Sequence, residues 1–140
     1  MARITAENSI ALEIERLQSL RSQLLSLHHA LLEMERRNFE KMFGRLTSGE
    51  LLQLVINHAQ FAWLRVISAL VVQIDELLDR EEPVTLADIQ DVTTQARALF
   101  TSSGNEEFRA KYELALQQHS EVVMAHSALM KLVRSKASSG

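Results

Sequence analysis

The stretch TSGELLQLVINHAQFAWLRVISALVVQIDELLDR, residues 47–80, decides the fold of this chain. It is the one segment apolar enough, over enough residues, to lie at the centre of a core. Its apolar residues recur at steps of three, four and seven, which is the repeat of a helix with one broad buried face. They are Leu51, Leu52, Val55, Ile56, Ala59, Ala62, Trp63, Val66, Ile67, Leu70, Ile74, Leu77 and Leu78. The spacing predicts one continuous helix over residues 47–80.

The start of this helix has its own signal. Thr47 and Glu50 have the spacing of a capping box, in which each side chain accepts a hydrogen bond from the other residue's backbone N–H. Leu46 and Leu51 flank the pair as a hydrophobic staple. We therefore expect the helix to begin at Thr47.

Five apolar residues fall outside the main buried stripe of the predicted helix, on or beside its polar side. They are Leu54, Phe61, Leu64, Val71 and Val72. An apolar patch of several hundred Å² is rarely left open on a soluble monomer. We expect these side chains to form the interface of a homodimer or larger homo-oligomer. The alternative is that the first or fourth helix covers them within one chain.

The segment before this stretch, residues 7–43, predicts one long first helix. Its apolar seam alternates three and four residues apart, as in a coiled coil. The seam consists of Leu17, Leu20, Leu24, Leu27, Leu31 and Met34. Gly44 follows at the position of a left-handed C-cap, and a basic cluster lies near that end, where positive charge favours the helix dipole.

Two further helices follow the central stretch. Thr85 and Asp88 repeat the threonine-plus-acid pattern of a helix start, which predicts a short third helix over residues 85–100. Either Ser103 or Asn105 then caps a fourth helix. The sequence therefore predicts an all-α fold, a four-helix up-down-up-down bundle with a short third helix, in one domain over residues 1–135 with a frayed tail at 136–140.

The expected helix lengths do not match. At 1.5 Å per residue the first, second and fourth helices would run roughly 55, 50 and 45 Å, whereas the third would run about 24 Å. Either a long helix kinks, or another subunit covers what the short helix leaves open.

Composition limits the classes of function. The chain has 140 residues, no cysteine and a formal net charge of −3, so neither disulfides, thiolate metal sites nor an attractive field for nucleic acid is expected. Charged residues interrupt every apolar run near the N-terminus, and polar residues interrupt residues 47–80. We expect no signal peptide, no membrane span and a cytoplasmic location.

Histidines are the candidate metal ligands. His29 and Glu33 are four residues apart on one helical face, while His119 and His126 are seven apart on another, and His58 could join them in a hemerythrin-like or mixed site. The pattern lacks both the Glu-x-x-His and the His-x-x-x-His spacing of bundle metal centres. We expect no metal and no cofactor, although convergence of these histidines stays open.

No catalytic arrangement stands out, because the serines lie in helices or caps and no phosphate-binding glycine loop is present. We expect no enzyme. An acidic run over residues 75–91 is the strongest charge feature. In an antiparallel bundle the basic end of the chain would reach the same pole and offset it, through Lys131, Arg134 and Lys136.

The segment HAQFAWLR at residues 58–65, followed by IDEL at 74–77 and Pro83, resembles stretches in a family of small uncharacterised bacterial helical-bundle proteins. The resemblance covers about a quarter of the chain. It implies a bacterial, cytoplasmic helical bundle and attaches neither an activity nor site residues.

The sequence thus favours a non-enzymatic, self-associating interaction or scaffold module whose protein partner is not specified. The alternative is a small-ligand or metal-binding helical bundle with a hemerythrin-like or ferritin-like site. In that alternative Trp63 would line a ligand cavity between helices instead of filling the core.

Overall fold

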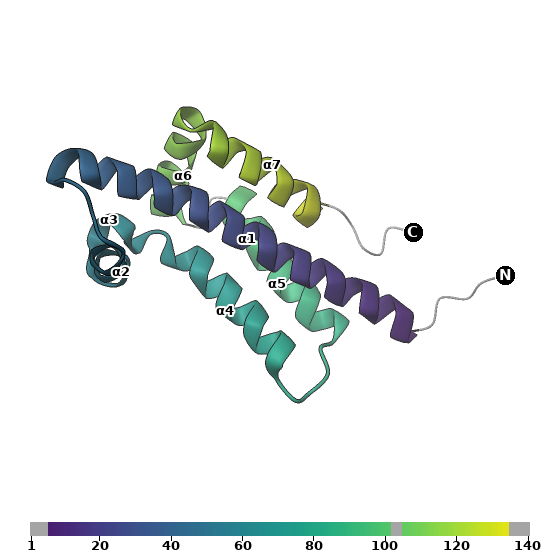
Figure 1. Ribbon diagram of the computed structural model, residues 1–140. Helices are drawn as coiled ribbons and strands as arrows, with labels where there is room; N and C mark the ends of the chain where they lie inside the picture. The colour runs from purple at the N-terminus through teal and green to yellow at the C-terminus, as the bar shows by residue number, and fades with distance from the viewer. Residues whose placement is uncertain (1–5, 102–104, 135–140) are drawn as a thin grey trace.

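The computed structural model describes residues 6–101 and 105–134, which form helices joined by short connections (Figure 1). The helices are α1 (Ala6–Phe43), α2 (Ser48–Asn57), α3 (Ala59–Ala62), α4 (Arg65–Asp79), α5 (Leu86–Thr101), α6 (Glu106–Gln118) and α7 (Ser120–Arg134). No strand occurs in these residues, so the all-α class is confirmed. The predicted second helix is divided into α2, α3 and α4, and the predicted fourth into α6 and α7.

Helix α1 is the element around which the others pack. Its predicted seam is confirmed, because all six seam residues are buried. Helices α4 and α5 lie along one side of α1, and α7 lies along another (Figure 1). The core therefore follows the seam of α1, and residues 47–80 contribute to it chiefly through α4, whose buried residues include Ile67, Leu70 and Ile74.

An aromatic cluster closes the part of the core next to α6. The Phe108 ring lies 5.5 Å from Trp63, 5.7 Å from Phe100 and 5.3 Å from Tyr112, measured between centroids. All four are buried. Offset and edge contacts of this kind add about 0.5–1.5 kcal/mol per pair beyond area burial. The cluster joins the residue that follows α3 to α5 and α6 across a long sequence distance.

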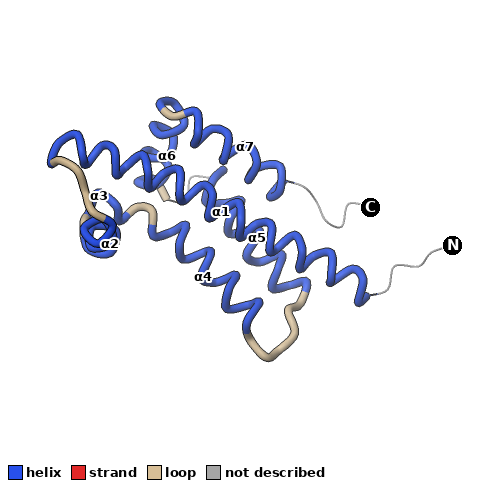
Figure 2. The backbone as a smooth tube through the Cα atoms, viewed as in Figure 1, coloured by secondary structure: helices blue, strands red, loops and turns tan. Residues whose placement is uncertain are grey.

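The predicted central helix is divided into α2, α3 and α4 (Figure 2), and its first break lies at His58, whose backbone is extended with φ −93° and ψ 137°. Neither Gly nor Pro causes it, so side chains must satisfy the freed backbone groups. His58 Nδ1 accepts a hydrogen bond from Gln60 N at 3.0 Å. The Arg65 guanidinium donates to the carbonyl oxygens of Val55 and Ile56. The chain bends again at Trp63 and Leu64 before α4 begins.

This break corrects the predicted oligomer interface. Phe61, Leu64 and Val71 are 0%, 1% and 7% exposed, so the expectation that they lie on an open surface is wrong. The two bends turn Phe61 and Leu64 inward, which a straight helix would not. Leu54 is partly buried, and Val72 alone of the five stays largely open, at 53% exposure.

A second break, at His119, divides the predicted fourth helix. The His119 backbone is extended, with φ −133° and ψ 113°, and its N–H bonds to the Ala115 carbonyl at the end of α6. Its own carbonyl accepts from the first turn of α7. Breaks therefore shorten the predicted second and fourth helices, whereas α1 stays continuous over 38 residues.

Helix starts were predicted well. The Thr47 capping box is present with both of its hydrogen bonds. Thr85 and Asp88 exchange the same pair of bonds, at 3.0 and 3.1 Å. Asn105 caps α6 by accepting from Phe108 N, whereas Ser103 lies outside the described residues, as does the predicted tail at 136–140. Each of these caps depends on residues within one turn.

The acidic run has other partners than predicted. Asp75 pairs with Arg21 of α1, and Asp88 pairs with Arg80, eight residues earlier in the chain. The end of α7 lies instead beside α5, where the Arg97 guanidinium donates to the Val133 carbonyl at 2.9 and 2.6 Å. Lys131 and Arg134 belong to this last turn, so they do not reach the pole where α4 ends and α5 begins (Figure 1). Lys136 lies outside the described residues.

The break at His58 gives a direct test by proline substitution. Ala59 is the first residue of α3, a position that tolerates proline, and the extended His58 before it suits a residue that precedes proline. Ala59→Pro should therefore leave the fold intact and raise the unfolding free energy by about 0.4–1 kcal/mol.

Ala69→Pro is the matched control, since Ala69 is also exposed but lies inside α4. Ala69→Pro should lower the unfolding free energy by about 3 kcal/mol or more. Urea denaturation followed by circular dichroism measures both. Equal losses for the two variants would mean that residues 47–80 form one continuous helix.

Candidate functional site

The histidines considered as metal ligands lie apart. His29 is exposed on α1, His58 caps α3, and His119 separates α6 from α7. His126 Nδ1 lies 2.7 Å from the Tyr112 hydroxyl. Across residues 6–101 and 105–134, no group of three or more histidine, cysteine, aspartate or glutamate side chains could hold a metal ion. These histidines therefore do not converge: His58 and His119 lie at helix ends, His126 lies beside Tyr112, and His29 is on the surface of α1.

Two histidines are held in their neutral form by burial. His28 Nε2 lies 3.1 Å from the Ser68 hydroxyl of α4, and burial lowers the pKa of His28. Burial also lowers the pKa of His126 beside Tyr112. Both rings therefore oppose protonation in the folded state.

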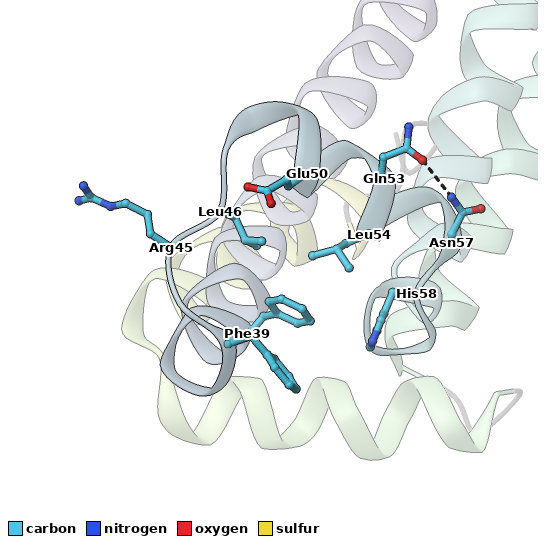
Figure 3. Close-up of a pocket in the computed structure, with 9 residues that line it drawn as sticks. Phe39, Arg45, Leu46, Glu50, Gln53, Leu54, Asn57 and His58 are labelled. Carbon is cyan, nitrogen blue, oxygen red and sulfur yellow. Dashed lines mark hydrogen bonds between the residues drawn. The ribbon is translucent and has the colours of Figure 1, made fainter.

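A groove with a largely apolar lining lies between the end of α1 and α2 (Figure 3). Its volume is about 520 Å³, within the range of small-ligand sites. It is lined by Phe39, Phe43, Arg45, Leu46, Glu50, Gln53, Leu54, Asn57 and His58. Of the residues expected at an interface, only Leu54 lies here.

The turn that forms one end of the groove is fixed by local contacts. Gly44 has a φ of +90°, which ends α1 in the left-handed conformation that glycine adopts at no steric cost. The Glu40 carboxylate accepts from Leu46 N at 2.8 Å and from the Arg36 guanidinium at 2.9 Å. The direction in which the chain enters α2 is thereby set.

Aromatic rings form the α1 wall of the groove. Phe39 and Phe43 lie 4.6 Å apart between centroids. The His58 ring meets Phe39 edge-on, at 5.5 Å and 86°. Leu54 faces them from α2 (Figure 3). This wall is suited to apolar or aromatic groups.

The polar residues of the groove are largely engaged in local structure. Glu50 accepts the Thr47 N–H, which lowers the pKa of the Glu50 carboxyl. Asn57 donates to Gln53 at 3.2 Å, and His58 caps α3 (Figure 3). Arg45 extends away from the groove at its rim (Figure 3). The geometry of the groove favours binding through apolar contacts over catalysis.

Helix α2 is unusually open for its composition. Five of its ten residues are Leu, Val or Ile, yet it has no buried side chain. Leu51, Leu54 and Val55 pack partly against the core, while Leu52 and Ile56 are 57% and 53% exposed. The segment that the sequence places at the centre of the core thus begins with a helix on the surface.

One buried carboxylate near the groove was not predicted from the sequence. Glu35 of α1 is 8% exposed and accepts from the Trp63 indole N–H at 2.7 Å. The Gln60 amide donates to the same carboxylate and to the Glu35 carbonyl, each at 3.3 Å. A glutamate beside the apolar seam was the available signal, because a charge in that position needs partners.

Trp63 is a core residue, as expected, at 6% exposure. A small cavity of about 220 Å³ adjoins it, lined by Ala62, Trp63, Val66, Asn105, Glu107 and Phe108. The indole N–H already bonds to Glu35, so it is not available to a ligand there.

Comparisons with protein-family models, curated proteins and solved structures give no match. The resemblance to bacterial bundle proteins therefore stays a prediction. Across the described part of the chain, no helix has the length and apolar character to cross a membrane.

The buried carboxylate supports a stability prediction. Glu35→Ala leaves the buried Trp63 indole N–H without its acceptor, which should lower the unfolding free energy by about 1–3 kcal/mol, while the Gln60 amide keeps the backbone carbonyl of residue 35. Denaturant unfolding can be followed by fluorescence, because Trp63 is the single tryptophan.

Glu33→Ala is the control, since Glu33 pairs with Arg36 three residues away on the same helix. Such a pair contributes only about 0.2–0.5 kcal/mol. If both alanine variants lost the same small amount of unfolding free energy, Glu35 would not stabilise the helix break at His58.

The neutral histidines predict acid sensitivity. The pKa values of His28 and His126 lie below the unfolded value of 6.5, so protons bind the unfolded chain more tightly. The unfolding free energy should therefore fall as the pH drops below about 6.5. The double variant His28→Gln and His126→Gln should flatten this dependence in urea titrations at a series of pH values. An unchanged slope would assign the acid sensitivity to other groups.

Proposed function

We propose that this chain is a non-enzymatic interaction module that works by self-association. The single observation that carries the proposal is α2, an apolar helix without a buried side chain. Next to it, Met42 and Phe43 at the end of α1 are 76% and 70% exposed. Exposed apolar surface of this kind marks interaction sites.

In this proposal the scaffold consists of α1, α4, α5 and α7, which pack on one another and alternate in direction along the chain (Figure 1). These helices take the place of the four rods expected from the sequence, while α2, α3 and α6 serve as connections. The rigid core holds the end of α1 and α2 outward, where a partner can reach them. The proposed setting is a bacterial cytoplasm, in keeping with a chain without cysteine.

A non-enzymatic role is supported by the groove itself. Its carboxylate belongs to a capping box and its imidazole to a helix cap, so neither is poised as a base or nucleophile. Binding through the aromatic wall requires no such group.

A second candidate is a receptor for a small apolar ligand. The groove volume of about 520 Å³ and the rings of Phe39, Phe43 and His58 favour it. In this case the chain would bind its ligand as a monomer.

Light scattering after size exclusion at micromolar concentration tests the first proposal. Self-association predicts a mass near twice the 15.9 kDa of one chain, or a larger multiple. The measured mass should also fall on dilution, since a surface of this size gives a finite dissociation constant. A mass of one chain at all concentrations would end the proposal and favour the ligand receptor.

A further inference from the structure

The groove and a pair of exposed apolar side chains lie next to each other at one end of the molecule. Phe43 lines the groove and is 70% exposed, and Met42 beside it is 76% exposed. A two-fold interface requires a patch that is complementary to itself, so that a projection on one subunit meets a depression on the other. This end of the chain offers both.

We propose that the groove between α1 and α2 receives Phe43 from a second copy of this chain, in a two-fold symmetric dimer. The inference rests on the proposed self-association and assigns its surface. Each Phe43 would lie against the partner's Phe39 and Leu54, with Met42 covering the rim. Since Phe43 also lines its own groove, the two rings would lie near the symmetry axis.

The available area is sufficient for such a dimer. A standard interface buries about 800 Å² per partner, of which roughly 450 Å² is apolar. At their exposures, Met42 and Phe43 each present on the order of 150 Å². The partly exposed lining residues Phe39, Leu46 and Leu54 supply most of the remainder.

Charge on the rim is also compatible with self-pairing. Arg45 and Glu50 carry opposite charges on the same groove, and Arg45 extends outward from it (Figure 3). A two-fold axis through the groove can bring each Arg45 toward the partner's Glu50. A rim of one sign would repel its own copy.

The competing surface is the far side of α2. Leu52 and Ile56 are exposed there, but on a helix they lie roughly opposite the groove residues Glu50 and Leu54. Neither residue lines this groove or the three smaller cavities found among the described residues. That side therefore has a ridge without a matching depression.

A charged residue placed on each surface in turn tests which of the two surfaces forms the dimer. Phe43→Glu should raise the dimer dissociation constant about thirtyfold or more, as expected for a residue at the centre of an interface. Leu52→Glu, a charge at a residue that is 57% exposed on the neighbouring helix α2, should leave this constant within about threefold. Light scattering over a dilution series gives both constants, and circular dichroism checks that each variant is folded.

Cross-linking adds a readout that does not depend on a destabilising charge. The chain has no cysteine, so single cysteines can be placed at Met42 or at Met124 of α7, which is 72% exposed. A short bismaleimide should join two Met42→Cys chains in high yield and two Met124→Cys chains only at background level. Equal yields at the two positions would overturn the assignment.

The outcomes also distinguish this inference from the proposal on which it rests. A dimer that survives Phe43→Glu but dissociates with Leu52→Glu would retain self-association and refute the groove as its surface. A monomeric wild-type chain would refute both and leave the groove to a small ligand.

Discussion

The buried carboxylate of Glu35 is the contact on which the rest of the structure depends. It lies on α1 and accepts hydrogen bonds from Trp63 and Gln60, 28 and 25 positions further along the chain. These bonds fix α3 against α1 next to the break that divides the apolar stretch of residues 47–80 into separate helices. Removing either donor from a buried carboxylate is expensive, because a charge in the core must be compensated. The direction in which α4 leaves α3, and thus its packing along the seam of α1, follows from this anchor.

The same break has two consequences. It turns Phe61 and Leu64 into the core, where each is at most 1% exposed and contributes about 1.5–3 kcal/mol by burial. It also separates α2 from the stripe that it would share with α4 in a straight helix, so that α2 is left with only partial packing. Burial in one half of the segment and exposure in the other therefore have a single cause. The apolar residues outside the main stripe are accommodated mostly within one chain, by bending, and the surface available for a partner moves to the end of α1.

Local signals in the sequence were sufficient for much of this fold. Capping at Thr47, Thr85 and Asn105 depends on side chains within one turn, and the leucine seam depends on a helical period, so both were predictable. The break at His58 was not, since neither Gly nor Pro marks it and the periodicity continues through it. It is stabilised by Glu35 and Arg65, whose partners are fixed only after the helices have packed. The expected exposure of Phe61, Leu64 and Val71 was wrong for the same reason: they lie off the stripe of a straight helix, and the helix is not straight.

The position of the groove follows from the length of α1, whose apolar face extends further than the helices that pack on it. Met42 lies eleven residues after Leu31, about three turns, so both belong to the same face of α1. Leu31 is fully buried and Met42 is 76% exposed. The apolar face of α1 therefore continues past the last helix that covers it. Because Gly44 then turns the chain back into α2 without burying a side chain of that helix, the exposed face and the groove are retained together. A second copy of the same end is a partner that would cover both at once, since it carries the same excess of apolar surface.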